Sequence, residues 1–198
     1  MKEQSLKAAL ESIKIESKAI ADVAENIDIE AFKKAVQAII SSNKTITCAC
    51  GHSGIAAKKF AHGLCCVEIN GFFLSPAEAV HGGLGGLKKG DTLVLVSRGG
   101  KTVELMPIMD VCKKKGATLI AVTENLESPL AKSADIVLPL KIEKESDKFN
   151  TQATASFVAT IALFDAIIVA IMEETGYTSE QFALIHPGGA VGERLNKR

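Results

Sequence analysis

DTLVLVSRGGKT, residues 91–102, is the segment from which the architecture of this chain can be read. Its continuous apolar run, Leu93–Val96, predicts a strand that is buried on both faces, since a half-buried strand would alternate apolar and polar residues. The run stops at Ser97, and a helical pattern follows Thr102. At such a turn, backbone N–H groups and the positive end of the helix dipole face a bound anion, and hydroxyl and basic side chains add donors. The segment therefore predicts a phosphate-binding turn made by Ser97, Arg98, Gly99, Gly100 and Thr102.

Apolar strand patterns alternate with helical patterns along the rest of the chain. The predicted strands are 45–50, 67–74, 92–96, 117–123 and 136–140. The predicted helices are 2–25, a helix that Asp28 would cap, 55–66, 102–115, 129–133, 152–174 and 178–185. This alternation favours the α/β class, with a parallel sheet covered by helices on both faces. No internal repeat or linker divides the chain, so we expect one domain over residues 1–198, with the helices of residues 1–44 packed on it.

The composition argues against several classes of protein. The chain has 198 residues, 47% of them apolar, and no apolar run is expected to approach the ~20 residues of a membrane span. Its first residues mix both charges, which argues against a secretory signal. With 23 basic and 23 acidic residues the net charge is zero, so neither nucleic acid nor a membrane is an expected partner. Five cysteines at irregular spacing predict reduced, mostly buried thiols in a cytoplasmic protein, and no metal site.

Two nucleotide-binding motifs are excluded, each because one required glycine is missing. The segment Gly100-Lys101-Thr102 ends like a P-loop, but the glycine required five residues earlier is replaced by Leu95. The pair Gly51 and Gly54 lacks the middle glycine of a dinucleotide-binding fingerprint. What remains is a second strand–serine–glycine turn, at Ser53. Each turn alone could be only a helix cap, but two of them at successive strand ends favour a phosphate site.

Five side chains are candidates for acid–base chemistry, and each also has a structural explanation. His81 lies in a glycine-rich loop that a ligand could approach closely, or it is a surface histidine. Glu104 lies in the first turn of a predicted helix, where a carboxylate also stabilises the dipole. Glu145 falls in a charged connector that could simply be solvated. His186 precedes Pro-Gly-Gly where chain ends are usually mobile, and His52 directly follows the first strand.

Several motifs taken together resemble one family. They are GHSG (51–54), AVHGGLG (79–85), SRGGKTVE (97–104), SPLA (128–131), TAS (154–156) and FALIHPGGAVG (182–192). In this combination the chain resembles the sugar isomerase (SIS) domain family, and more narrowly its arabinose-5-phosphate isomerase branch. The resemblance covers nearly the whole chain, and the terminal HPGGAVG is its most specific part.

The resemblance implies a three-layer α/β/α sandwich with a five-stranded parallel sheet. It also implies a homotetramer, with sites at subunit interfaces, that interconverts an aldose phosphate and a ketose phosphate. The residues implied to hold the phosphate are Ser53, Ser97 and Thr102, with Thr154 and Ser156 adding contacts. The implied acid–base set is His81, Glu104, Glu145 and His186.

The chain departs from the family pattern at four positions. His52 stands where the family usually has lysine, and Gly83 where it has aspartate. In the phosphate turn, Gly99 and Lys101 replace a serine and an acid, so the basic side chains could supply charge-assisted donors in place of a hydroxyl. Full-length members carry CBS modules, which we do not expect here because the sequence ends at Arg198.

The implied reaction moves a proton between C1 and C2 through an enediolate, with arabinose 5-phosphate and ribulose 5-phosphate as the expected pair. It requires no metal or organic cofactor. Our hypothesis assigns the base to Glu104, proton transfers at the oxygens to His186 and His81, and positioning of the sugar to His52 or Glu145. Two alternatives stay open: an isomerase for another sugar phosphate, such as a hexulose 6-phosphate, and a non-catalytic sugar-phosphate sensor.

Overall fold

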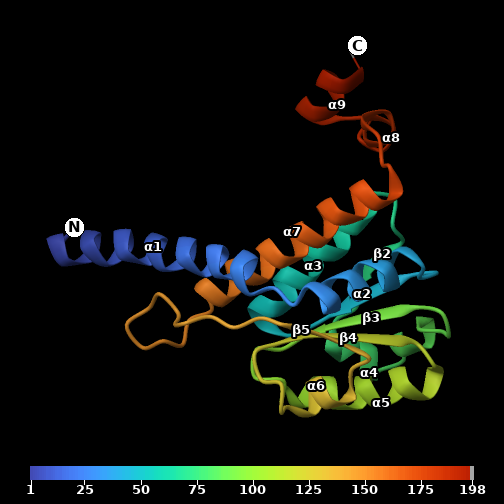
Figure 1. Ribbon diagram of the computed structural model, residues 1–198, viewed down its shortest axis with the longest axis horizontal. Coiled ribbons are helices and arrows are strands. Elements are labelled where there is room, and N and C mark those ends of the chain that lie inside the picture. The colour runs from blue at the N-terminus through green and yellow to red at the C-terminus, as the bar shows by residue number, and fades with distance from the viewer. Residues whose placement is uncertain (197–198) are drawn as a thin grey trace.

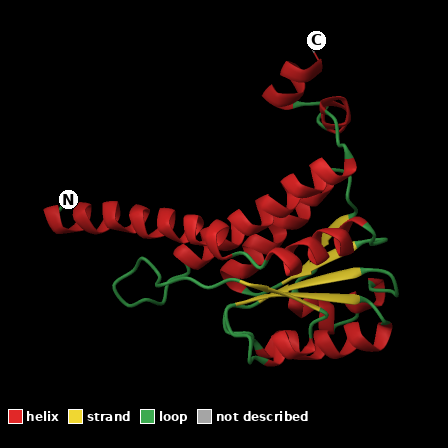
Figure 2. Ribbon diagram, viewed as in Figure 1, coloured by secondary structure: helices red, strands yellow, loops and turns green. Residues whose placement is uncertain are grey.

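Five parallel strands form the centre of the computed structural model, which describes residues 1–196 (Figure 2). The strands are β1 (Thr45–Cys48), β2 (Gly71–Phe73), β3 (Thr92–Val96), β4 (Thr118–Thr123) and β5 (Ile136–Pro139). Their order across the sheet is β2-β1-β3-β4-β5. In this register Thr92 of β3 lies between Thr45 of β1 and Thr118 of β4. The predicted α/β class and the five-stranded parallel sheet are confirmed.

Helices cover both faces of the sheet (Figure 1). The helices of one face are α2 (Ile29–Ile40), α3 (Gly51–Cys65) and α7 (Ala155–Thr175). Those of the other face are α4 (Pro76–Val80), α5 (Met106–Lys115) and α6 (Pro129–Ser133). Because successive strand residues point to opposite faces, Val94 packs in the core with α3 and α7, and Leu95 packs in the core with α5. The continuous apolar run of β3 is thus used on both faces.

The first and last helices extend beyond these layers. They are α1 (Glu3–Asn26), α8 (Ser179–Ile185) and α9 (Gly189–Asn196). α1 packs along α7, and its N-terminal half projects past the body of the molecule (Figure 1). α2 begins where Asp28 accepts a hydrogen bond from the Ala31 N–H at 2.9 Å, as the sequence predicts. α8 and α9 lie beyond the end of α7.

Several predicted elements differ in extent from the structure. Residues 51–54, expected to be a turn before a helix over 55–66, are the first turn of that helix, α3. The strand predicted over 67–74 is only β2, because Glu68 takes a positive φ of 57° and residues 67–70 form the turn that ends α3. The helix predicted over 102–115 begins as a 3₁₀ turn, η2 (Val103–Leu105), before α5 starts next to Pro107. The segment 75–90, expected to be mostly loop, contains α4 and the 3₁₀ turn η1 (Gly83–Gly86).

The expectation that no segment is apolar enough to span a membrane is wrong for α7. By length and composition alone it is apolar enough to do so. In the fold it packs against α1 and α3, and the stacked rings of Phe60 and Phe164, 4.1 Å apart, join α3 to α7. The core helix of a soluble protein meets the same criterion, so its hydropathy is weak evidence for a membrane.

The five cysteines are free thiols. Cys48 and Cys112 are buried, and burial raises the pKa of each thiol to about 12, which keeps both protonated and unreactive. The expectation that most of the thiols are buried is wrong, since Cys65 is exposed and Cys50 and Cys66 are half-buried.

Candidate active site

The predicted site residues follow the carboxyl ends of three strands. Ser53 follows β1, Ser97 follows β3, and Glu145 lies in the connector after β5. Thr123, which was not predicted as a site residue, ends β4 at the same edge. Because the strands are parallel, these ends lie at one edge of the sheet, where ligands of open α/β sheets bind. The topology therefore gathers residues that are far apart in the sequence.

The turn after β3 is closed by its own hydroxyl groups. The Oγ of buried Ser97 lies 2.8 Å from the Oγ1 of Thr102, and it accepts the Gly100 N–H at 3.1 Å. Gly100 has a φ of +63°, which a glycine adopts without strain. One hydroxyl hydrogen joins Ser97 to Thr102, so the other is left to donate to a ligand. Phosphate binding at this turn stays a prediction.

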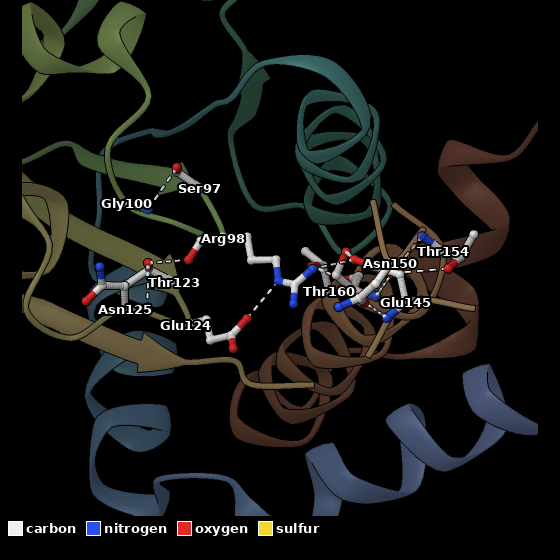
Figure 3. Close-up of polar contacts among 11 residues, drawn as sticks. Ser97, Arg98, Gly100, Thr123, Glu124, Asn125, Glu145, Asn150, Thr154 and Thr160 are labelled. Carbon is white, nitrogen blue, oxygen red and sulfur yellow. Dashed lines mark hydrogen bonds and ion pairs between the residues drawn. The ribbon is translucent and has the colours of Figure 1, made fainter. Parts of the chain in front are cut away.

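Arg98 points away from this turn, toward two carboxylates (Figure 3). Its Nε donates to Glu124 at 2.7 Å, and its Nη1 donates to Glu145 at 2.8 Å. Its backbone carbonyl accepts the Thr123 hydroxyl at 3.0 Å, which ties the turn to the end of β4. The guanidinium is therefore paired with protein groups at two of its nitrogens.

Glu145 is a fully hydrogen-bonded carboxylate with 2% of its surface exposed. Its Oε2 accepts the Thr154 N–H at 3.0 Å, the Thr154 hydroxyl at 3.1 Å and the Ser156 N–H at 3.1 Å. Its Oε1 accepts the Ser156 hydroxyl as well as Arg98. A carboxylate offers about four lone-pair sites. These five contacts therefore leave no acceptor free for a substrate, and they anchor the connector to the first turn of α7.

The ionisation of Glu145 should make the fold sensitive to acid. Burial alone would raise its pKa, but the hydrogen bonds from Ser156 and Thr154 hold that pKa below the ordinary 4.5. The unfolded chain then takes up a proton before the folded chain does, so this stabilisation is complete above about pH 4.5 and is lost as the pH falls through the folded-state pKa. We expect Glu145→Gln to flatten the acid decline in the free energy of unfolding, measured by urea titration at several pH values. An unchanged decline would contradict this.

The first turn of α3 borders a small cavity and a large groove. His52 and Ser53 line a cavity of about 30 Å³ together with Arg98 and Ser156, which is room for about one water molecule. On its other side, Gly51 and Gly54 line a groove of about 750 Å³. Of these two spaces, only the groove has the size of a site for a small metabolite.

Glu104 is the predicted acid–base residue that stands in this groove. It is exposed, and the groove walls around it are mostly apolar, including Ile55, Phe73 and Val80. His81 is exposed and immediately follows Val80, so it lies at the border of the groove. His52 is also exposed, and its ring makes a T-shaped contact with Phe157 of α7, with centroids 6.0 Å apart.

His186 lies at the opposite edge of the sheet. α7 carries the chain back from the connector over 21 residues, about 31 Å of helix. In α8, the side-chain amide of Gln181 donates a hydrogen bond of 2.8 Å to the carboxylate of Glu68, a residue just before β2. The His186 ring stacks on Phe182 with centroids 3.9 Å apart, and its Nδ1 lies 2.8 Å from the Phe182 carbonyl. The structure therefore does not bring His186 to the groove of its own chain.

Three polar residues that were not predicted as site residues support the edge of the sheet formed by the carboxyl ends of the strands. Glu124 binds Arg98, Asn150 accepts the Glu145 N–H at 2.6 Å, and buried Ser128 lies against Gly100. Glu124 stands at a strand end and Ser128 begins the SPLA motif, and both were usable signals. Asn150 acts across a turn that has no local pattern. Within residues 1–196, no three His, Cys, Asp or Glu side chains gather as a metal site.

Comparison with known proteins identifies relatives of this chain. The SIS domain model matches residues 38–170. The arabinose 5-phosphate isomerase KdsD of Pseudomonas aeruginosa is 38% identical over 165 residues, covering 83% of this chain and 51% of that protein. The protein of the same name from Francisella tularensis is 32% identical over 191 residues, covering 94% of this chain and 58% of that protein. The chain thus spans little more than half the length of these curated relatives.

Two solved structures share the fold over nearly the whole chain. A candidate sugar-phosphate isomerase from Listeria monocytogenes is 47% identical, with a TM-score of 0.90 over 95% of this chain and 100% of that one. The Escherichia coli CFT073 protein c3406, solved in complex with arabinose 5-phosphate, is 29% identical, with a TM-score of 0.88 over 94% of this chain and 100% of that one. Together with the match over residues 38–170, these likenesses establish that the chain belongs to the SIS domain family.

Proposed function

We propose that this chain is an aldose–ketose isomerase that interconverts arabinose 5-phosphate and ribulose 5-phosphate. The observation that carries the proposal is the position of Glu104, exposed in a groove of metabolite size, two residues beyond the Ser97–Thr102 turn. Curated relatives at 32–38% identity are arabinose 5-phosphate isomerases, which supports this choice of sugar.

The chemistry needs one base on the carbon skeleton and proton transfers at two oxygens. In our proposal, the Glu104 carboxylate takes the proton from C2 of the open-chain aldose while the C1 carbonyl oxygen gains a proton, which gives the enediol form. The O2 hydroxyl then loses its proton as the C2 carbonyl forms, and Glu104 returns the carbon-bound proton to C1. Ser53, Ser97, Thr102 and the N–H groups of the turn hold the phosphate. His81 and His186 exchange protons with O1 and O2, and His52 positions the sugar.

His186 reaches this chemistry only from a second copy of the chain, because it lies at the opposite edge of its own sheet. We therefore propose a homotetramer in the cytoplasm with sites shared between subunits. Exposed apolar side chains on α1 and α7 give such an assembly surfaces to bury; they are Leu6, Leu10, Ile13, Ile20 and Val169.

Sharing of the site predicts that two inactive variants restore each other. We expect mixed oligomers of His186→Ala and Glu104→Gln chains to regain about a quarter of the wild-type activity, since random pairing joins an intact His186 to an intact Glu104 at that frequency. The measurement is kcat after co-refolding, compared with each variant refolded alone. Activity no higher than that of the single variants would argue against sharing.

The proposed reaction is tested by isotope exchange. Purified protein is incubated in D₂O with a panel of pentose, hexose and amino-sugar phosphates. Deuterium at C1 or C2 of the pentose phosphates is the expected result. If only another sugar phosphate takes up deuterium, that sugar is the substrate in place of arabinose 5-phosphate. If a sugar phosphate binds but takes up no deuterium, the protein is a sensor.

A further inference from the structure

The two cations of the phosphate turn have different surroundings. Arg98 is paired with Glu124 at 2.7 Å and with Glu145 at 2.8 Å. Lys101 is exposed, and across residues 1–196 the structure gives it no ion pair. Figure 3 shows the Arg98 side chain extended between the two carboxylates, away from Ser97 and Gly100.

The Arg98 pairs connect three separate segments. Glu124 follows β4, Glu145 belongs to the connector after β5, and Arg98 itself lies in the turn after β3. Glu145 in turn binds the first residues of α7 through Thr154 and Ser156. A shift of the Arg98 guanidinium would therefore release the connector from the turn as well as break two ion pairs.

The balance of charge also indicates that Lys101, and not Arg98, is available to a phosphate. Glu124 and Glu145 place two negative charges at the edge where a phosphate ester is expected to bind, and the single charge of Arg98 does not fully offset them. If Arg98 turned to the phosphate, buried Glu145 would be left with an unpaired charge, which is unfavourable. Lys101 can approach a phosphate without breaking any ion pair.

We propose that Arg98 is a positioning residue that holds Glu145 and the connector against the turn, and that Lys101 is the cation that binds the substrate's phosphate. This inference rests on the proposed function for the identity of the substrate. It gives Glu145 a role through Arg98 and α7, in place of proton transfer.

The test compares Arg98→Met with Lys101→Met. Lys101→Met should raise KM for arabinose 5-phosphate and the inhibition constant of inorganic phosphate together, each by about tenfold, because a charge-assisted contact is lost. Arg98→Met should act mainly on kcat, lowering it by about tenfold through misplaced groups. Lys114→Met, which removes an exposed charge from the far end of α5, is the matched control.

A double-mutant cycle separates positioning from a general loss of stability. Arg98→Met combined with Glu145→Gln should be no worse than either single variant, whereas Arg98→Met combined with Lys101→Met should be close to additive. Arg98→Lys should rescue only in part, since one ammonium cannot reproduce the two-sided contact of the guanidinium. If Arg98→Met weakens phosphate inhibition as strongly as Lys101→Met does, the assignment is overturned.

A second readout does not depend on turnover. Hydrogen exchange of residues 141–156 should speed up in Arg98→Met and stay at the wild-type rate in Lys101→Met and Lys114→Met. Unchanged exchange in Arg98→Met would overturn the positioning role. If the wild type isomerises no sugar phosphate, the proposed function fails, but exchange and inorganic phosphate binding still decide between the two cations.

Discussion

Glu104→Gln is expected to lower kcat by about 10²–10⁴-fold, the usual contribution of a single general base. Glutamine keeps the size of the side chain but cannot take a proton from carbon. Because Glu104 is exposed and lies in the groove beside the turn, the substitution leaves Ser97 and Thr102 in place. Binding of the sugar phosphate, measured by calorimetry, should therefore survive while kcat falls.

The control for this prediction is Asp110→Asn. It removes an exposed carboxylate from α5, the helix that follows Glu104, and should leave kcat near the wild-type value. Loss of deuterium exchange in Glu104→Gln, with binding retained, would place the defect in proton abstraction. An unchanged kcat would remove Glu104 from the mechanism.

Gly100→Ala should have the largest effect on stability. A methyl group at this position would overlap the side chain of Ser128, and the backbone φ is +63°. Ser128 is completely buried and caps α6 through a 3.2 Å bond from the Ala131 N–H, so it cannot move aside freely. We expect the free energy of unfolding, measured in urea, to fall by about 2–5 kcal/mol, from left-handed strain and overpacking together. Phosphate binding should weaken with it, because the Gly100 N–H holds Ser97 in place.

Gly99→Ala is the matched control for that experiment. It lies one residue away, is exposed, and a methyl group there meets no atom within 4 Å. Its effect on the free energy of unfolding should stay within about 0.5 kcal/mol. Equal stability of the two variants would show that Gly100 is not a packing constraint.

The fold could be predicted where the signal was local and continuous. β3 has the predicted bounds of 92–96 because its apolar run ends abruptly at Ser97. The same reasoning overextended β2, since Val67 and Ile69 are apolar but lie in the turn after α3, from which they pack into the core. Apolar character alone does not distinguish a strand from a buried turn.

The candidate site was predictable only in its local parts. The Ser97–Thr102 turn and Glu104 follow from a short motif. The pairing of Arg98 with Glu145 joins residues 47 positions apart, and the sequence pattern around Glu145 indicates only a charged connector. Likewise, the motif around His186 could be found in the sequence, but its distance from the groove depends on the length and direction of α7.

The direction of α7 has a consequence for how the amount of active protein is set. A helix that returns the chain to the far edge of the sheet leaves each folded copy with a groove that lacks His186. Under the shared-site arrangement, a lone chain is complete as a fold but incomplete as a catalyst. Activity then rises more steeply than in proportion to the number of chains synthesised, until assembly is saturated.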